Sequence, residues 1–400
     1  MDRFDVRAVA ERGGVEPEFV DRVAGMDIVT PDGEGRFSQG DVRRVKLMQT
    51  LERAGVPLDT VANAVKDDVF SLSFLDDPVY DRFASLGQVT FAGLSEETGL
   101  PVELLMVVRE VIGSAQPQPD DRLREDELRI VPFIRFAIGA GVDGQGVERL
   151  LRVYGDSLRR VAETEADWWH TELMPVLGTN LDPTQLLEAA DRLPTEATMW
   201  SDQAILAIYH AQQAHAWTKS MIETVETALD EAGLHSRLER VPAIGFLDVT
   251  GYTRLTEERG DLEAATVADN VTRMVQRISV RHGGEQVKRL GDGVMLRYPE
   301  PGSGVLAALE MVEGVAEAGL PPAHVGVHAG PVLFQDGDYY GRTVNVAARI
   351  ADYARPGEVL VSQAVLDASD RPEVVYTEVG PVELKGVAEP TRLWVASRRG

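Results

Sequence analysis

Apolar residues recur at helical spacing through most of the first 235 residues, and shorter strand-like runs replace them after Arg240. Residues 155–235 are predicted to be nearly all helix, punctuated by Pro175, Pro183 and Pro194. One long helix is predicted from Ser201 to Ala232, because its apolar residues form a single stripe: Ile205, Ile208, Ala211, Ala214, Met221, Ile222, Val225 and Leu229. The stripe fits a core helix and a dimerising helix that signals to the next domain equally well.

A repeat is visible in the first 150 residues. Three segments recur at offsets of 85, 86 and 86 residues, starting at Gly14 and Gly99, at Phe37 and Leu123, and at Ala54 and Ala140. A nearly constant offset across three segments indicates two copies of one structural unit.

Both copies follow the same predicted plan. A short helix pair near 6–26 and 91–113 is followed by a loop rich in Pro and Gly. A longer helix follows near 39–54 and 125–139, and a short one near 58–66 and 144–154. In the first copy, Ser38 and Asp41 have the spacing of a helix N-cap. This order of elements resembles the winged-helix module of MerR-type regulators.

Charge argues against the DNA binding that this resemblance implies. Residues 1–150 carry 28 acidic and 17 basic residues, and the whole chain has a formal net charge of −25. Such a field repels nucleic acid, and a DNA-recognition surface should be basic. We therefore favour a reused scaffold that binds a ligand or the catalytic half, with DNA binding as the alternative.

The composition excludes several kinds of functional site and cellular location. The chain has 400 residues and no cysteine, so disulfides, thiolate metal sites and cysteine nucleophiles are excluded. No run approaches the length of a membrane span, and the first residues lack a signal-peptide profile. We expect a cytoplasmic protein of two or three domains.

The second half presents carboxylates at strand ends. A buried strand is predicted from Ala243 to Leu247; it ends at Asp248, and a helix begins at about Thr253. The turn Gly291-Asp292-Gly293 joins two further predicted strands. Two carboxylates near one phosphate suit magnesium, because this ion takes oxygen ligands. The alternative for Asp292 is an ordinary turn residue, which is the most frequent role of an Asp in a hairpin.

A predicted helix near residue 345 carries a polar pair. Asn345 and Arg349 are four residues apart and therefore share a helix face, whereas Val344, Ala347, Ala348 and Ala351 can pack on another. An amide and a guanidinium aligned in this way suit the ribose and phosphates of a nucleotide. Taken alone, the segment fits an ordinary exposed pair equally well.

Together these segments resemble the class III nucleotide cyclases. The matching segments are Phe246–Thr253, Lys288–Met295, Gly326–Gly330, Gly341–Arg349 and Leu384–Gly386, in the family's order and spacing. The resemblance covers about 160 residues. It implies an α+β protein, with a ferredoxin-like α/β sandwich as the catalytic domain. The half before it is expected to be an all-α regulatory domain with two winged-helix-like repeats.

The resemblance also implies roles for particular residues of an adenylate cyclase that converts ATP to cyclic AMP and pyrophosphate. Two Mg²⁺ or Mn²⁺ ions per site would be held by Asp248 and Asp292. Lys288 and Asp338 would read adenine, because they complement its N1 acceptor and N6 donor; guanine would need the reverse pattern. The remaining roles fall to Asn345 for the ribose, Arg349 for the transferring phosphate, and Phe246, Thr250, Gly251, Tyr252 and Lys385 for the phosphates.

In family homodimers each site is shared, with metal aspartates from one chain and the other groups from its partner. The connection Pro331–Gly337 is about two residues shorter than in the mammalian-like subclass and resembles a short-arm bacterial one. Several mycobacterial members pair such a domain with an N-terminal helical inhibitory domain. The alternative function is a MerR-like regulator whose cyclase-like half only senses nucleotide.

These features predict four regions: winged-helix-like repeats at 1–85 and 86–155, a helical region at 156–235 and the catalytic domain at 236–400. The regulatory signal stays open between a proton, a lipid and another small molecule. His210, His215 and His235 could sense pH or be solvent-facing polar residues. Trp168, Trp169, Trp200 and Trp217 could line a pocket for a fatty acid, although core packing is the favoured interpretation.

Overall fold

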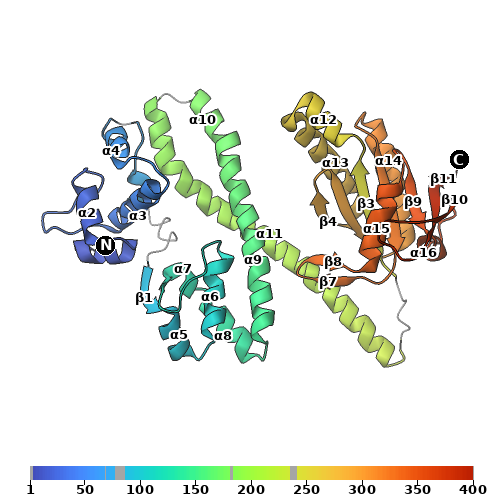
Figure 1. The fold of residues 1–400 in the computed structure, drawn as a ribbon, viewed down its shortest axis with the longest axis horizontal. Coiled ribbons are helices and arrows are strands. Elements are labelled where there is room, and N and C mark those ends of the chain that lie inside the picture. The colour runs from blue at the N-terminus through green and yellow to red at the C-terminus, as the bar shows by residue number, and fades with distance from the viewer. Residues whose placement is uncertain (1–2, 68, 77–85, 181–182, 235–240, 400) are drawn as a thin grey trace. The chain divides into compact units, whose positions relative to one another are not determined.

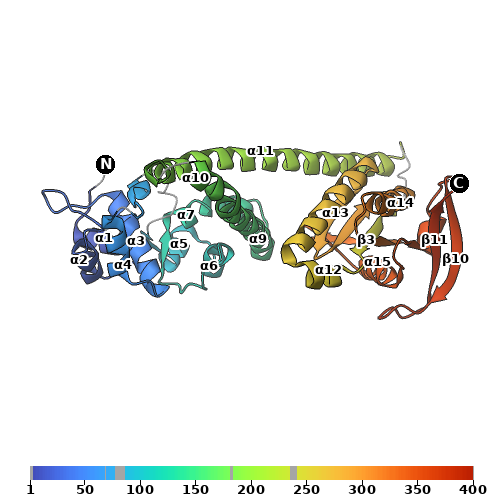
Figure 2. The same ribbon diagram turned by 90° about the horizontal axis from the view of Figure 1, so that it is seen from above.

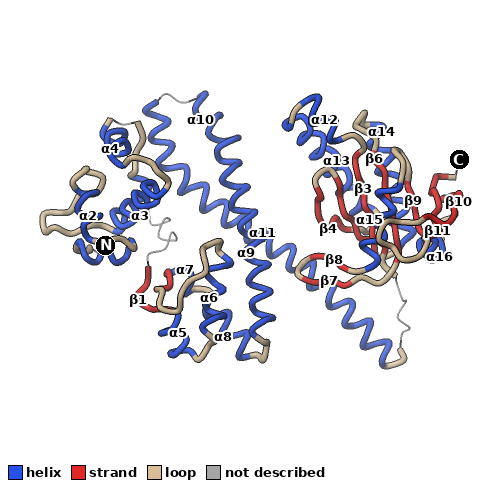
Figure 3. Tube along the Cα trace, viewed as in Figure 1, coloured by secondary structure: helices blue, strands red, loops and turns tan. Residues whose placement is uncertain are grey.

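The computed structural model describes residues 3–67, 69–76, 86–180, 183–234 and 241–399, so His235 lies outside the described residues. The chain divides into two units, residues 1–224 and residues 225–400. Helices make up nearly all of the first unit, whereas the second combines a large sheet with helices (Figures 1 and 3). In the described part of the chain, no helix is both long and apolar enough to cross a membrane.

The two predicted repeats have matching elements. The first contains α1 (Val6–Gly13), α2 (Pro17–Ala24), α3 (Gln39–Arg53), α4 (Leu58–Lys66) and the 3₁₀ turn η1 (Ser73–Asp76). The second contains β1 (Leu86–Thr90), α5 (Phe91–Thr98), α6 (Val102–Val111), β2 (Arg122–Arg124), α7 (Glu125–Leu128) and α8 (Val131–Gly139). The strand pair β1–β2 corresponds to the isolated bridge between Phe4 and Phe37.

Helix caps recur at the same offsets. The Asp5 side chain accepts from Ala8 N–H, and the Thr90 side chain accepts from Gly93 N–H. The predicted cap of α3 is confirmed as a capping box between Ser38 and Asp41. Recurrence of caps and turns, and not of hydrophobic residues alone, indicates that one local fold is used twice.

Two helix predictions differ from the structure. The helix expected over 125–139 is divided into α7 and α8, because Pro132 lies at the start of α8, where a missing N–H costs no hydrogen bond. The short helix expected near 144–154 is the beginning of α9 (Gly144–Trp168), which continues through residue 155. The domain boundaries at 85, 155 and 235 remain predictions.

Long helices follow the second repeat. A π-helical segment, η3 (Trp169–Leu173), follows α9 and leads into α10 (Met174–Asn180). The last helix, α11 (Pro183–Glu231), has 49 residues and continues past Pro194 (Figure 2). The prediction that the tryptophans pack in a core is wrong for three of them in the single chain. Trp168, Trp200 and Trp217 are 52%, 65% and 64% exposed. His210 and His215 are also exposed.

The apolar stripe of α11 is exposed as well. Ile208, Met221 and Ile222 are each more than half exposed in the single chain. A core helix of this unit would bury these side chains, so the stripe is not part of the hydrophobic core of the first unit.

The second unit is built on a seven-stranded sheet of order β10-β11-β9-β6-β3-β5-β4. Its strands are β3 (Ala243–Val249), β4 (Glu285–Leu290), β5 (Gly293–Tyr298), β6 (Ala323–Ala329), β9 (Val359–Ser362), β10 (Val374–Val382) and β11 (Thr391–Arg398). A separate hairpin is formed by β7 (Leu333–Gln335) and β8 (Asp338–Tyr340). The helices are α12 (Tyr252–Arg259), α13 (Asp261–Arg281), α14 (Pro301–Glu317), α15 (Arg342–Tyr353) and α16 (Gln363–Asp367).

Strand alternation separates the two faces of this sheet. Leu247 on β3 packs in the large core with side chains of α13 and α14. Ile244 packs with Met295 and Ala347 of α15 on the opposite face. The order β6-β3-β5-β4, with α13 and α14 on one face, is the ferredoxin-like arrangement, so the predicted α+β fold is confirmed. Asp248 has the same strand parity as Ile244 and therefore lies on the α15 face.

Candidate active site

The two predicted metal-binding carboxylates lie close together. Asp248 is near the end of the buried strand β3, and Asp292 is in the turn between β4 and β5. Because β5 pairs directly with β3, this turn lies beside Asp248. A Cβ atom on Gly293 would come within 3.3 Å of Asp248 Oδ1, which shows how close the turn approaches.

Electrostatics reflect this proximity. Burial, followed by the negative charge of Asp292, raises the pKa of Asp248, and only part of this effect is offset by His324. Ionising both carboxylates is therefore unfavourable without a cation between them. Their oxygens are the hard ligands that Mg²⁺ and Mn²⁺ take, so this pair fits a divalent metal. No cluster of three or more potential metal ligands occurs among the described residues.

Lys288 and Asp338, predicted to read the base, are brought together from positions 50 residues apart. Lys288 is on β4 and Asp338 begins β8, and their side chains form an ion pair. The other carboxylate oxygen of Asp338 accepts from Tyr339 N–H at 2.8 Å. Both side chains stay partly exposed, at 38% and 20%, so a ligand could reach them.

Asn345 and Arg349 lie on the outer face of α15, as their spacing predicts. Both are exposed, whereas Val346, Ala347 and Ile350 are buried against the sheet. Arg349 Nη1 donates to Asp352 Oδ2 at 2.6 Å. In the described part of the chain, neither Asn345 nor Arg349 has a hydrogen bond or ion pair with Asp248 or Asp292.

The predicted phosphate loop follows Asp248. Gly251 has a φ of 78° and is the N-cap residue of α12, where it makes no side-chain cap hydrogen bond. The Thr250 N–H donates to Pro322 O at 2.9 Å, so this amide already has a partner. Phe246 is half-buried, Tyr252 is partly exposed and Lys385 is exposed after β10. The phosphate role of these residues remains a prediction.

One residue near Asp248 was not predicted from the sequence. His324 on β6 is directly opposite Asp248 in the β3–β6 register, and its Nε2 is 3.9 Å from Asp248 Oδ2. Its Nδ1 is hydrogen-bonded to Thr250 Oγ1 at 3.2 Å. Residues 76 positions apart become neighbours only through strand register, and no local pattern reveals that register.

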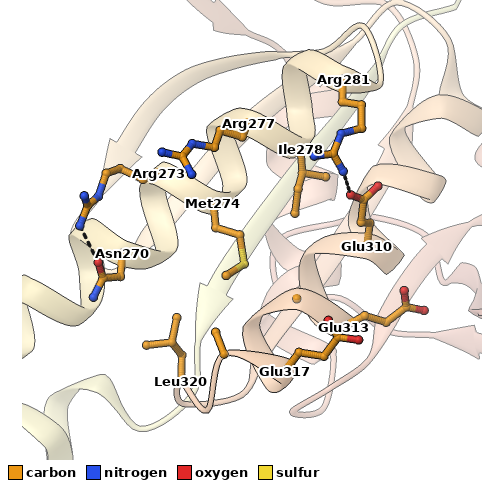
Figure 4. Close-up of a pocket in the computed structure, with 12 residues that line it drawn as sticks. Asn270, Arg273, Met274, Arg277, Ile278, Arg281, Glu310, Glu313, Glu317 and Leu320 are labelled. Atoms are coloured by element: carbon orange, nitrogen blue, oxygen red, sulfur yellow. Dashed lines mark hydrogen bonds and ion pairs between the residues drawn. The ribbon is translucent and has the colours of Figure 1, made fainter.

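A surface groove of the catalytic unit lies away from these residues. It has a volume of about 770 Å³ and lies between α13 and α14 (Figure 4). These helices cover the sheet face opposite Asp248. Arg273, Arg277 and Arg281 line one wall, and Glu310, Glu313 and Glu317 line the other. None of the predicted site residues lines this groove.

A half-buried histidine on β6 makes stability depend on pH. His328 Nδ1 is hydrogen-bonded to Ser362 Oγ at 2.7 Å, and burial, followed by the charge of Arg342, lowers the pKa of His328 to about 4. The unfolded chain, with an ordinary histidine pKa near 6.5, therefore binds this proton more readily than the folded chain. Folding free energy contributed by neutral His328 is lost as the pH falls from about 6.5 toward 4.

Replacing His328 by glutamine should therefore reduce the acid sensitivity of the fold. We expect the melting temperature of the variant to fall less between pH 7 and pH 4.5 than that of the unchanged protein. Differential scanning fluorimetry measures this, with the exposed His210→Gln as control. Equal pH dependence in all three proteins would contradict the assignment.

Two family models match the chain. The adenylate and guanylate cyclase catalytic domain matches residues 235–397, and the adenylate cyclase regulatory domain matches residues 32–178. The chain is 26% identical over 367 residues to a pH-sensitive adenylate cyclase of Mycobacterium tuberculosis, covering 89% of this chain and 88% of that protein.

Two further proteins match the chain over shorter regions. The chain is 27% identical over 188 residues to an adenylate cyclase of Streptomyces coelicolor, covering 47% of this chain and 48% of the other. The crystal structure of the adenylyl cyclase CyaB from P. aeruginosa covers 40% of this chain and 94% of its own, with 21% identity and a TM-score of 0.36.

Proposed function

We propose that this chain, a class III adenylate cyclase with an adenylate cyclase regulatory domain before its catalytic domain, converts ATP to 3′,5′-cyclic AMP and pyrophosphate. The observation that carries the proposal is the Lys288–Asp338 pair, whose donor and acceptor complement the N1 and N6 positions of adenine. The Asp248–Asp292 pair supplies the anionic oxygens that a divalent metal needs.

In the proposed reaction, the ribose 3′-oxygen loses its proton and attacks the α-phosphorus. The bond from the α-phosphorus to the bridging oxygen breaks, and pyrophosphate leaves. Metal ions held by Asp248 and Asp292 would supply positive charge for the ionising 3′-oxygen and the triphosphate.

The chain's own polar groups supply the remaining steps. Lys288 Nζ donates to adenine N1, and Asp338 accepts from the N6 amino group. Asn345 orients the ribose, and the Arg349 guanidinium offsets charge that develops at the α-phosphorus. The uncapped N-terminus of α12 offers N–H groups to phosphate oxygens.

We propose that two copies of the chain share each site. The exposed face of α15, which carries Asn345 and Arg349, would act on a nucleotide bound at Asp248 and Asp292 of the partner subunit. The exposed apolar stripe of α11 supports an assembly of at least two copies. A regulatory domain that changes how the copies meet would then control turnover, with a proton, a lipid or another small molecule as its signal.

The proposal is tested with the purified full-length chain, ATP and either Mg²⁺ or Mn²⁺. We expect cyclic AMP and pyrophosphate in equal amounts, and a kcat/KM for GTP at least about tenfold lower, since guanine presents the reverse hydrogen-bonding pattern. Mass spectrometry of the products measures both. Nucleotide binding without turnover across pH 5 to 8, together with a gel shift on genomic DNA fragments, would instead support the nucleotide-sensing DNA regulator.

A further inference from the structure

The two base-reading residues are on separate hairpins that share no strand pairing. Lys288 is on the β4–β5 hairpin of the large sheet, and Asp338 is on the two-stranded β7–β8 hairpin. Strand hydrogen bonds therefore do not fix the distance between them. Some other contact must hold one hairpin against the other if the pair is to read a base.

Tyr339, the residue after Asp338, makes such a contact. Its side chain is only 8% exposed and packs with Ile244, Met295 and Ala347. Its hydroxyl donates to Glu285 Oε1 on β4 at 2.8 Å. The ring also contacts Phe334 of β7, with centroids 4.9 Å apart, so Tyr339 joins both strands of its hairpin to the sheet.

The acceptor is itself held in place across the sheet. Glu285 is directly opposite Arg297 in the β4–β5 register, and Arg297 Nη1 donates to Glu285 Oε1 at 3.1 Å. The Arg297 guanidinium also lies over the Tyr339 ring, 5.2 Å from its centroid. Each of Tyr339, Glu285 and Arg297 thus contacts the other two, and we call these three residues the hairpin clamp.

A β-bulge puts the hairpin clamp and Lys288 on the same face of the sheet. In a regular strand, Glu285 and Lys288 would point to opposite faces because they are three residues apart. The register shifts between Gln286 and Lys288, so that Glu285 is opposite Arg297 and Lys288 is opposite Met295. Arg297 and Met295 share a face, and therefore Glu285 and Lys288 do as well.

We propose that Tyr339 is a positioning residue for base selection: its hydroxyl, held by Glu285 and Arg297, fixes the β7–β8 hairpin so that Asp338 stays opposite Lys288. The proposal rests on the proposed function, in which this pair reads adenine. Without the hydroxyl, the hairpin can shift, and the separation that matches N1 and N6 is lost. Recognition of ATP should then weaken more than recognition of GTP.

The test compares Tyr339→Phe with Tyr340→Phe, a matched control that removes a hydroxyl from the next residue, which is 47% exposed. We expect Tyr339→Phe to reduce the ratio of kcat/KM for ATP to that for GTP by about fivefold, the factor expected for one lost hydrogen bond. KM for ATP should account for most of the change. Hydrogen exchange of residues 333–340 should accelerate in this variant, and the control should change neither quantity.

Two further variants separate the possible outcomes. Glu285→Ala should reproduce the effect, and the double variant should lose no more than the worse single variant, because both break one link. Suppose that Tyr339→Phe accelerates hydrogen exchange of residues 333–340 but leaves the ratio of kcat/KM for ATP to that for GTP unchanged. The hairpin clamp would then have only a structural role, and the proposal would be wrong. An unchanged ratio in Lys288→Ala would instead show that the base-reading assignment, and hence the proposed function, is wrong.

Discussion

Replacing either Asp248 or Asp292 by asparagine should reduce kcat by more than about a thousandfold, because each change removes one anionic ligand from a site where metal charge is worth several kcal/mol. Asparagine keeps the size of the side chain, so the fold should persist. The assay is cyclic AMP production by each purified variant at saturating ATP and Mn²⁺. Asp336→Asn is a matched control, because Asp336 is exposed in the β7–β8 turn at a φ of 55°, a conformation that asparagine tolerates.

Asp248→Asn should also raise the stability of the fold, although it removes activity. The pKa of Asp248 is raised in the folded chain, so ionised Asp248 opposes folding at neutral pH. Asp248→Asn should therefore melt at a higher temperature than the unchanged protein at pH 7 without metal. This gain should shrink as the pH falls and should be lost below 3.8, where Asp248 is protonated in both the folded and the unfolded chain. In the activity assay, more than about a tenth of the wild-type kcat in either Asp248→Asn or Asp292→Asn would contradict the metal role.

Local sequence signals predicted the elements that are stabilised locally. The Ser38–Asp41 cap and the Gly291–Gly293 hairpin turn each depend on residues a few positions apart. Local hydrogen bonds and positive-φ glycines determine such features, so they can be read from a single sequence.

Long-range features could not be predicted in this way. The β3–β6 register that places His324 opposite Asp248, and the bulge that turns Lys288 toward the hairpin clamp, depend on pairing between distant strands. The exposure of Trp200 and Trp217 was also missed, because hydrophobicity alone does not separate a core residue from one on an open surface. Which side chains become neighbours across the sheet can be determined only from the folded structure.

The sharing of sites between chains predicts recovery of activity from two inactive proteins. Asp248→Ala lacks a metal ligand, and Arg349→Ala lacks the guanidinium, so each homodimer has two defective sites. In a mixed dimer, one site takes its carboxylates from the Arg349→Ala chain and its guanidinium from the Asp248→Ala chain. That site is intact, and the other carries both lesions. With random pairing, about a quarter of the wild-type activity should return, since half of the dimers are mixed and each has one good site.

A matched mixture tests whether the recovery has this cause. Asp248→Ala mixed with Asp292→Ala should stay inactive, because both lesions affect the same half of a shared site and every site in the mixed dimer lacks one carboxylate. The two chains carry different affinity tags, so that mixed dimers can be isolated before the assay. Isolated mixed dimers of Asp248→Ala and Arg349→Ala that remain inactive would mean that each chain houses a complete site. Arg349 would then have to leave Asp352, its present partner at 2.6 Å, and reach Asp248 and Asp292 within its own subunit.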